Sequence, residues 1–282
     1  MTRLALILAF ASALLVSPRR AAAGGWTQRE GGFYGKLSGR LYLGDAAFGP
    51  QGQRVPTPSF VQGQLDLYLE VGVHERVTVV GRLTPWGRAR IDGRHADYLG
   101  PMVAGARVGL ITEGRLRLAL QGTYGYAAPA LGRDVLWEDT VTVDGEAIPT
   151  IYRPAIENHR VEAQVQVGRS FMIRQTPGWV TGDLGVRLNT GFLHALTGYA
   201  QVGVSPWRFR FDLHVSVYEP FFRTLTVANV PGVGDTRYLG MGLGVAFAIT
   251  EHVGLTVDAD GVFYAQSNAH SPSLNLGIEG RL

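Results

Sequence analysis

The chain of 282 residues contains no cysteine. Disulfide frameworks, thiol chemistry and thiolate metal sites are therefore excluded, and the fold must be held by burial and hydrogen bonding alone. Beyond the first 23 residues, no stretch approaches the roughly 18 uninterrupted apolar residues that indicate a membrane-spanning helix. Glycine, by contrast, is abundant at 38 residues, mostly inside segments of alternating polarity. Glycine weakens a strand in a soluble sheet, but it eases bending and wall packing in a closed barrel.

The first residues have the organisation of a secretory signal peptide. Arg3 precedes an apolar run over Leu4–Val16, and small residues follow up to Ala21–Gly24. A transmembrane anchor is the alternative, but the run is shorter than the ~20 apolar residues that a bilayer requires. We expect residues 1–23 to be removed after Ala23, which leaves 24–282 as the mature domain.

Removal of this leader changes the charge balance. It takes away Arg3, Arg19 and Arg20 and no acid, so 23 basic residues remain against 23 acidic ones. The mature chain is formally neutral, and it contains no basic stretch with interleaved aromatic residues. The sequence therefore gives no support for a nucleic-acid partner.

The clearest structural signal is alternation with a period of two. Along Val61–Val73 every second residue is apolar or glycine, and the residues between them are mostly polar, such as Gln62, Asp66 and Glu70. A helical stripe through the same segment mixes both kinds, so the pattern predicts a β-strand with one apolar and one polar face.

The same pattern recurs in twelve segments. They are Phe33–Asp45, Phe60–His74, Val77–Arg90, Met102–Ile111, Leu116–Tyr126, Arg160–Phe171, Trp179–Asn189, Leu196–Ser205, Phe209–Tyr218, Arg237–Ile249, Val253–Tyr264 and Ser273–Leu282. Short connections (His74–Arg76, Thr112–Arg115, Arg174–Gly178, Pro206–Arg208, Thr250–His252) alternate with mostly longer ones (Gly44–Ser59, Ile91–Pro101, Ala127–His159, Pro220–Asp235). Short turns on one rim and long loops on the other are typical of an outer-membrane barrel. We therefore expect an all-β fold, an antiparallel transmembrane β-barrel of about twelve strands with both termini in the periplasm.

One face of each segment suits lipid. The rows are uncharged at mid-strand, as in Leu239, Met241, Leu243 and Val245, and the segments reach the ~9 to 11 residues that cross a bilayer. Aromatic residues expected in the interfacial girdles are Phe33, Trp179, Trp207, Phe209, Phe247 and Phe263. A soluble barrel or sandwich shows the same alternation, but loop asymmetry, strand length and the leader together favour the membrane.

The opposite face is polar and predicts a charged lumen. The lumen or constriction candidates are Lys36, Arg40, Asp66, Glu70, Arg82, Arg107, Arg117, Asp183, Arg187, Asp212, His214, Asp258, Asp260 and Glu279. Barrel closure places the first strand between the second and the twelfth. Arg40 then falls near the height of Asp66, with Asp258 and Asp260 two strands away. We expect an ion-paired belt with Arg40 as its central cation.

Two runs carry a family resemblance. They are Gly25-Trp26-Thr27-Gln28, with Gly31-Gly32-Phe33-Tyr34-Gly35-Lys36-Leu37-Ser38 following, and the strand-turn-strand over Leu67–Gly81. The first third of the chain resembles the exported outer-membrane barrels grouped under the label of meta-pathway phenol degradation. This resemblance implies transport of small molecules, often aromatic or hydrophobic. The chain departs from the usual outer-membrane ending, because its last residue is Leu282 rather than an aromatic residue.

Motifs with catalytic or metal-binding spacing are weak. His214-Val215-Ser216 has the spacing used by outer-membrane lipid hydrolases, but its side chains share the predicted lumen face and no Asn-Gly follows. Asp258 and Asp260 lack a further ligand at fixed spacing, so pairing with lumen arginines is expected instead of metal binding. We expect no catalytic residues, no cofactor and no metal.

The longest connection predicts a substructure of its own. Thr140–Val143 and Glu146–Ile148 flank Asp144-Gly145, which is the signature of a β-hairpin with a type I′ turn. The loop contains more acidic than basic residues. It either favours cations at the mouth of the barrel or is an ordinary solvated hairpin.

The sequence thus predicts an outer-membrane channel for passive uptake of small solutes, aromatic or hydrophobic ones among them, in a Gram-negative bacterium. The main alternative is a structural or surface-interaction barrel whose lumen is closed by salt bridges, and a lipid hydrolase is a minor one. Expected partners are outer-membrane lipid and lipopolysaccharide, the barrel-assembly machinery and the small-molecule solute.

Overall fold

A computed structural model of the chain describes residues 26–131, 134–190, 194–221, 225–230 and 236–282. Within these residues, twelve long strands form the barrel wall. They are β1 (Phe33–Phe48), β2 (Arg54–His74), β3 (Val77–Ile91), β5 (Met102–Ile111), β6 (Leu116–Ala127), β9 (Asn158–Ile173), β10 (Thr176–Asn189), β11 (Ala195–Val204), β12 (Phe209–Pro220), β14 (Arg237–Ala248), β15 (Val253–Gln266) and β17 (Ser273–Arg281). The signal-peptide prediction lies outside the described residues.

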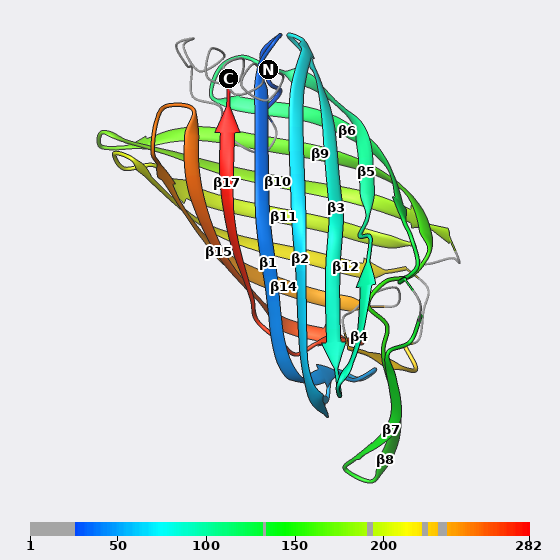
Figure 1. Ribbon diagram of the computed structural model, residues 1–282. Helices are drawn as coiled ribbons and strands as arrows, with labels where there is room; N and C mark the ends of the chain where they lie inside the picture. The colour runs from blue at the N-terminus through cyan, green and yellow to red at the C-terminus, as the bar shows by residue number, and fades with distance from the viewer. Residues whose placement is uncertain (1–25, 132–133, 191–193, 222–224, 231–235) are drawn as a thin grey trace, which may run out of the picture.

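The wall closes on itself. Neighbouring wall strands pair antiparallel in chain order, and β1 pairs with both β2 and β17. In Figure 1, β1 to β3 cross in front of β9 to β12 at a steep angle, because strands of a closed barrel tilt relative to its axis. The predicted all-β, twelve-stranded antiparallel barrel is confirmed.

The apolar rows of the strands face outward and the polar rows face the lumen, as the sequence predicts. On β14 the outward Leu243 side chain is 59% exposed, and the outward Leu184 of β10 and Ile278 of β17 are exposed to a similar extent. The polar residues between them turn inward, and several, such as Asp66 and Glu162, are buried. A belt of exposed aliphatic side chains around a polar interior is the reverse of a soluble barrel and suits a lipid environment. Among the described residues, no helix is long and apolar enough to cross a membrane.

The two rims differ. Short connections join β2 to β3, β5 to β6, β9 to β10, β11 to β12 and β14 to β15, and both ends of the described chain lie on the same rim (Figure 1). There, Phe33 and Leu282 exchange two backbone hydrogen bonds. We call this end the short-turn rim and the opposite end the long-loop rim.

Several predicted loops of the long-loop rim contain strand. The connection expected over Ile91–Pro101 holds β4 (Arg94–Tyr98), which pairs with β3 across an Asp92-Gly93 turn where both residues have positive φ. Asp-Gly favours this hairpin turn, so the signal was present in the sequence. Arg88 donates two hydrogen bonds to Asp97 across the hairpin and holds the pKa of that carboxyl below its usual value.

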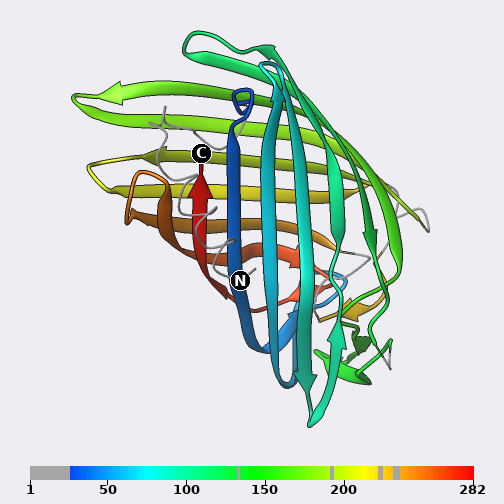
Figure 2. The same ribbon diagram turned by 45° about the horizontal axis from the view of Figure 1, so that its top comes forward.

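The predicted hairpin in the longest connection is also present. β7 (Trp137–Val143) and β8 (Glu146–Tyr152) flank Asp144 and Gly145, whose φ angles are 51° and 85°. β13 (Ala228–Asn229) adds to β8 in parallel, and β16 (Asn268–Ala269) pairs with the outer end of β1. Figure 2, which turns the barrel toward the viewer, shows the β7–β8 hairpin at the end opposite the short turns.

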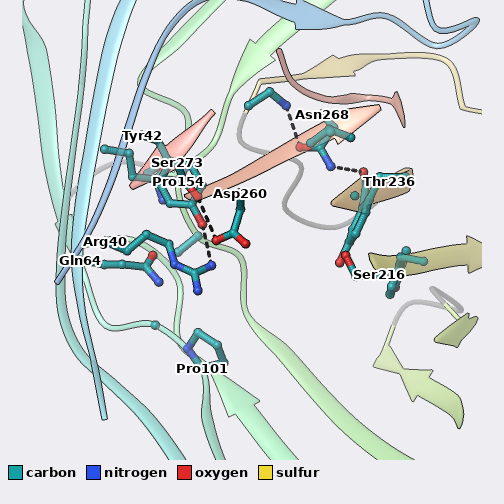
Figure 3. A pocket seen from close by; sticks show the side chains of 18 of the residues that line it. Arg40, Tyr42, Gln64, Pro101, Pro154, Ser216, Thr236, Asp260, Asn268 and Ser273 are labelled. Atoms are coloured by element: carbon teal, nitrogen blue, oxygen red, sulfur yellow. Dashed lines mark hydrogen bonds between the residues drawn. The ribbon is translucent and has the colours of Figure 1, made fainter. Parts of the chain in front are cut away.

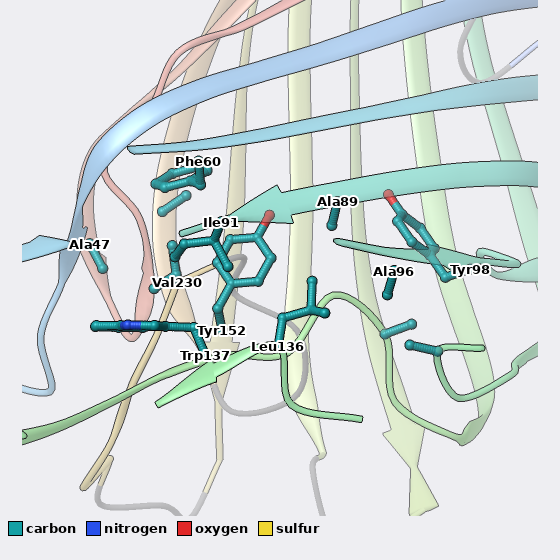
Figure 4. Packing of buried hydrophobic residues seen from close by; sticks show 13 residues of the cluster. Ala47, Phe60, Ala89, Ile91, Ala96, Tyr98, Leu136, Trp137, Tyr152 and Val230 are labelled. Atoms are coloured by element: carbon teal, nitrogen blue, oxygen red, sulfur yellow. The ribbon is translucent and has the colours of Figure 1, made fainter. Parts of the chain in front are cut away.

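A hydrophobic core lies at the long-loop rim rather than along the wall. Phe60, Ile91, Leu136, Tyr152 and Val230 are each at most 2% exposed and belong to one cluster that joins the wall to the loop sheet (Figure 4). Burial raises the pKa of the Tyr152 phenol, which stays protonated and donates a hydrogen bond to Gln62 Oε1 at 3.2 Å. The loops therefore form a packed cap on one end of the barrel.

One aromatic residue departs from the expected girdles. Trp207 and Phe263 are strongly exposed, as girdle residues are, but Trp179 is only 8% exposed and packs over Gly203 inside the barrel. Its neighbour Val180 takes the outward position, so strand alternation turns the indole inward. The girdle assignment of Trp179 is wrong.

Candidate functional site

The interior of the barrel is the candidate functional site, because the polar faces of all wall strands meet there. The lumen contains ion pairs that involve most of the sequence-predicted candidates: Lys36–Asp258, Arg40–Asp66, Arg82–Asp66, Arg107–Glu70, His214–Asp260 and His214–Asp212, together with Arg187–Glu162 and Arg210–Glu279. Within the described residues, Arg117 and Asp183 take part in no ion pair.

Asp66 on β2 is the acceptor around which the predicted belt is arranged. Its carboxylate lies 3.9 Å from Arg40 Nε and 3.8 Å from an Arg82 nitrogen, distances that allow ion pairing without a direct hydrogen bond. Gln64 and Thr84 donate the hydrogen bonds that Asp66 does accept. Arg40 instead donates to the Tyr42 hydroxyl at 3.2 Å.

Lys36 and Glu279 lie directly opposite each other in the β1–β17 register. Each of the two residues nevertheless forms its ion pair with a different residue. The Lys36 ammonium lies 2.7 Å from Asp258 on β15, whereas Glu279 accepts two hydrogen bonds from Arg210, at 3.0 and 2.8 Å. A long side chain in a narrow lumen reaches past its direct neighbour, so backbone register alone does not fix the partners.

The segment before β1 enters the lumen near the short-turn rim. The Gln28 amide donates from its backbone to Thr78 Oγ1 at 2.8 Å and from its side chain to Glu70 at 2.6 Å. Arg107 pairs with Glu70 at 3.0 Å and donates to the Trp26 carbonyl at 2.9 Å. Thr78, Glu70 and Arg107 are each at most 4% exposed, so this segment covers part of the lumen wall.

His214 lies between two carboxylates. Its Nε2 lies 2.8 Å from Asp260 on β15, its Nδ1 lies 3.4 Å from Asp212 on its own strand, and its ring stacks on Tyr199. Both ring nitrogens therefore face acids rather than Ser216. In the part of the chain that the structure describes, no group of three or more His, Asp or Glu side chains is placed to hold a metal ion.

A cavity of about 640 Å³ occupies the lumen toward the long-loop rim. Charged residues in its lining are Arg40, Arg82, Arg160, Arg187, His214 and Asp260, and aromatic ones are Tyr42, Phe60, Tyr98, Tyr199, Tyr218 and Tyr238. In Figure 3, the side chains of Arg40 and Asp260 extend into this space close to each other. Its volume is in the range of sites for small organic molecules.

Some residues of this interior were not singled out from the sequence. Arg160 alternates with the outward rows in the same way as the predicted residues, so that signal was available. Glu162 and Arg210 lie on the face that the sequence predicts to be polar, although they are not among the constriction candidates. Gln28 had no such signal, because it precedes the first alternating segment and its contacts depend on the path of an irregular stretch.

Comparisons with known proteins address the fold. No protein-family model and no curated protein matches the chain. Among solved structures, the chain is similar to the COG4313 outer membrane channel from Pseudomonas putida F1, with 13% identity, 95% of this chain and 100% of that chain covered, and a TM-score of 0.58.

Two further structures have the same kind of wall. The translocator domain of the autotransporter NalP from Neisseria meningitidis has 11% identity over 100% of this chain and 95% of its own, with a TM-score of 0.51. The NanC porin has 6% identity over 88% of this chain and 100% of its own, also with a TM-score of 0.51. The chain thus has the fold of outer-membrane β-barrel proteins, and the comparisons do not extend to the meta-pathway phenol-degradation group.

Proposed function

We propose that the protein is an outer-membrane channel for passive movement of small solutes in a Gram-negative bacterium. The observation that carries this proposal is the cavity of about 640 Å³ inside a closed barrel, lined by polar and charged side chains. The similar structures include one described as an outer membrane channel and one described as a porin. The belt of exposed aliphatic residues supports residence in lipid.

The same proposal fixes an orientation and an export route. By the general rule for these barrels, the short-turn rim and both termini face the periplasm and the long-loop rim faces outside. Residues 1–23 direct export, and lipid, lipopolysaccharide and the assembly machinery are the partners of the wall.

The solutes that we propose are small and include aromatic ones. Five tyrosines and Phe60 line the cavity, and aromatic rings pack favourably on one another in offset or edge-on arrangements. The resemblance of the N-terminal third to the phenol-degradation barrels points to the same class of solute.

A closed structural barrel is the second candidate, and one observation favours it. The segment Trp26–Gln28 lies inside the lumen, bonded to Thr78, Glu70 and Arg107 near the short-turn rim. A solute must pass beside this segment, or the segment must move. A lipid hydrolase has less support, because both nitrogens of His214 face carboxylates within the lumen and not a serine beside the bilayer.

Single-channel recording of the purified full chain in a planar bilayer tests the proposal. A channel gives discrete conductance steps, and sugar-driven swelling of vesicles reports passage of uncharged solutes. Heat-modifiable migration on a detergent gel first establishes that the barrel is folded. A folded barrel without conductance and without vesicle swelling would leave the closed structural barrel as the function.

A further inference from the structure

Basic side chains outnumber acidic ones among the residues that line the cavity. Its lining includes the guanidinium groups of Arg40, Arg82, Arg160 and Arg187, while Asp260 is the acid of the lining and is already bound by His214. In a confined lumen, charges act on a solute with less screening than at an open surface. This wall attracts anions.

Arg160 is the residue that points most directly to a ligand. It lies on β9 between Gly125 of β6 and Asn189 of β10, and within the described residues it forms no ion pair and no hydrogen bond. The guanidinium groups of Arg187 and Arg82 lie near it, as does the Glu162 carboxylate, which is already bound by Arg187. A partly buried guanidinium among like charges is stabilised by an anion that enters from the cavity.

Arg82, in the lining of the same cavity, also has N–H groups that donate no hydrogen bond to a carboxylate. Its nearest carboxylate oxygen, on Asp66, is 3.8 Å away, too far for a hydrogen bond, and 44% of its side chain is exposed to the lumen. Arg187 differs, because it donates to Glu162 through two nitrogens, at 3.1 and 2.9 Å. Arg82 and Arg160 are therefore the cations available to a solute. Two forked guanidinium groups suit the two oxygens of a carboxylate.

The neighbouring wall is aromatic. Tyr218 and Tyr238 stack with an interplanar angle of 10° and ring centroids 5.9 Å apart, and the Arg187 guanidinium lies 5.6 Å from the Tyr218 centroid. Both tyrosines line the cavity together with Arg82 and Arg160. Planar rings beside free guanidinium groups match a ligand that has both a ring and an anionic group.

We propose that this cavity binds small aromatic carboxylates of the benzoate type, with the carboxylate on Arg82 and Arg160 and the ring against the Tyr218–Tyr238 wall. The assignment deepens the proposed channel function, since it names a solute class for the same lumen. Binding itself needs no flux, so the two proposals can be tested separately.

Titration calorimetry with sodium benzoate, carried into the millimolar range, tests the site on the folded full chain in detergent. Benzoate binds saturably, and benzamide, a neutral molecule of the same shape, binds at least tenfold more weakly, because a hydrogen bond between charged groups is replaced by a neutral one. Acetate, which lacks the ring, also binds more weakly than benzoate.

The variants use Arg→Gln throughout. Arg160→Gln lowers benzoate affinity by about tenfold, the typical loss for one charge-assisted hydrogen bond. Arg82→Gln also lowers benzoate affinity, and this second variant tests the site if Arg160→Gln does not fold. Arg88→Gln is the matched control, because Arg88 pairs with Asp97 outside the cavity lining, and its benzoate affinity is unchanged.

Equal binding of benzoate and benzamide overturns the proposal, as does unchanged benzoate affinity in both folded Arg→Gln cavity variants. Benzoate binding by a barrel that gives no conductance supports the site and overturns the channel. Conductance by a barrel that does not bind benzoate overturns the site and leaves the channel in place.

Discussion

His214 and Asp260 are joined across an intervening strand. Nε2 of the imidazole lies 2.8 Å from the carboxylate, yet β12 and β15 are separated by β14, and the residue between them in both registers is Gly242. A Cβ atom built on Gly242 would overlap both the His214 ring and the Asp260 carboxylate. The contact therefore depends on the absence of a side chain at residue 242.

The first prediction concerns this glycine. Gly242→Ala places a methyl group between His214 and Asp260, and we expect a loss of about 1 to 3 kcal/mol in the free energy of unfolding, the usual range for overpacking. Urea unfolding in lipid vesicles measures it. Gly122→Ala is the matched control, because a Cβ there has no neighbour within 4 Å. Equal stability of the two variants would contradict this account of the glycine.

A second prediction concerns the lipid-facing side of the same strand. Leu243 is 59% exposed and lies in an uncharged row, so Leu243→Arg should destabilise the barrel by roughly 2 to 4 kcal/mol if it meets the middle of the bilayer. Ile249→Arg, near the short-turn rim, should cost no more than about 1 kcal/mol. The same vesicle unfolding assay compares them, and similar losses at both positions would count against the assigned depth.

The third prediction is topological. A protease-sensitive tag inserted between Asp144 and Gly145, at the tip of the β7–β8 hairpin, should be cleaved on intact cells, because this tip belongs to the long-loop rim. A tag at Thr250–Glu251, on the short-turn rim, should be protected until the outer membrane is opened. The reverse pattern would invert the orientation.

Arg40 provides a test of the permeation path. Arg40→Glu puts a further carboxylate beside Asp66 and near Asp260 and so should shift the selectivity of the channel toward cations, as well as change its conductance. Reversal potentials in a salt gradient measure the shift. Arg54→Glu is the control, since Arg54 is an exposed residue paired with Asp45 outside the cavity lining. An unchanged reversal potential for Arg40→Glu would remove this residue from the narrow part of the path.

The fifth prediction concerns the segment inside the lumen. Gln28→Ala removes the 2.6 Å hydrogen bond to Glu70, and we expect a larger or more frequently open conductance because the segment is held less firmly. Glu30→Ala changes an exposed residue of the same segment and should leave the recordings as they are. Identical single-channel traces from the unmodified protein, Gln28→Ala and Glu30→Ala would mean that the segment does not control the permeation path.

Strand alternation made most of this architecture predictable. A period of two identifies all twelve wall strands and the direction of each row, because a side chain on a strand has only two faces to choose between. The same rule, applied to Trp179, would have placed the indole inside, since Val180 belongs to the outward row. The error arose because Trp179 was assigned to the girdle from its position near the end of a strand, without regard to the face of the strand on which it lies.

The partners in the ion pairs were harder to predict from the sequence. Arg40 and Asp66 lie near each other as expected, but Lys36 binds Asp258 rather than the facing Glu279, because rotamers and reach decide between acids at similar distances. The path of Trp26–Gln28 had no periodic signal at all. The core at the long-loop rim depends on loops that are far apart in the sequence, such as those holding Leu136 and Val230.

The inner face of β14 has a bearing on the evolution of the chain. Gly240, Gly242 and Gly244 alternate with Leu239, Met241, Leu243 and Val245, and a Cβ at each glycine would overlap Ser216, His214 or Asp212 of β12. The two faces of this strand therefore tolerate different substitutions. The outward positions accept any apolar residue that lipid accepts, while the three glycine positions have no room for a Cβ unless the facing β12 side chains move. Related sequences should therefore vary at the outward positions between these glycines and keep the three glycines themselves, because the side chains of β12 occupy the space in front of them.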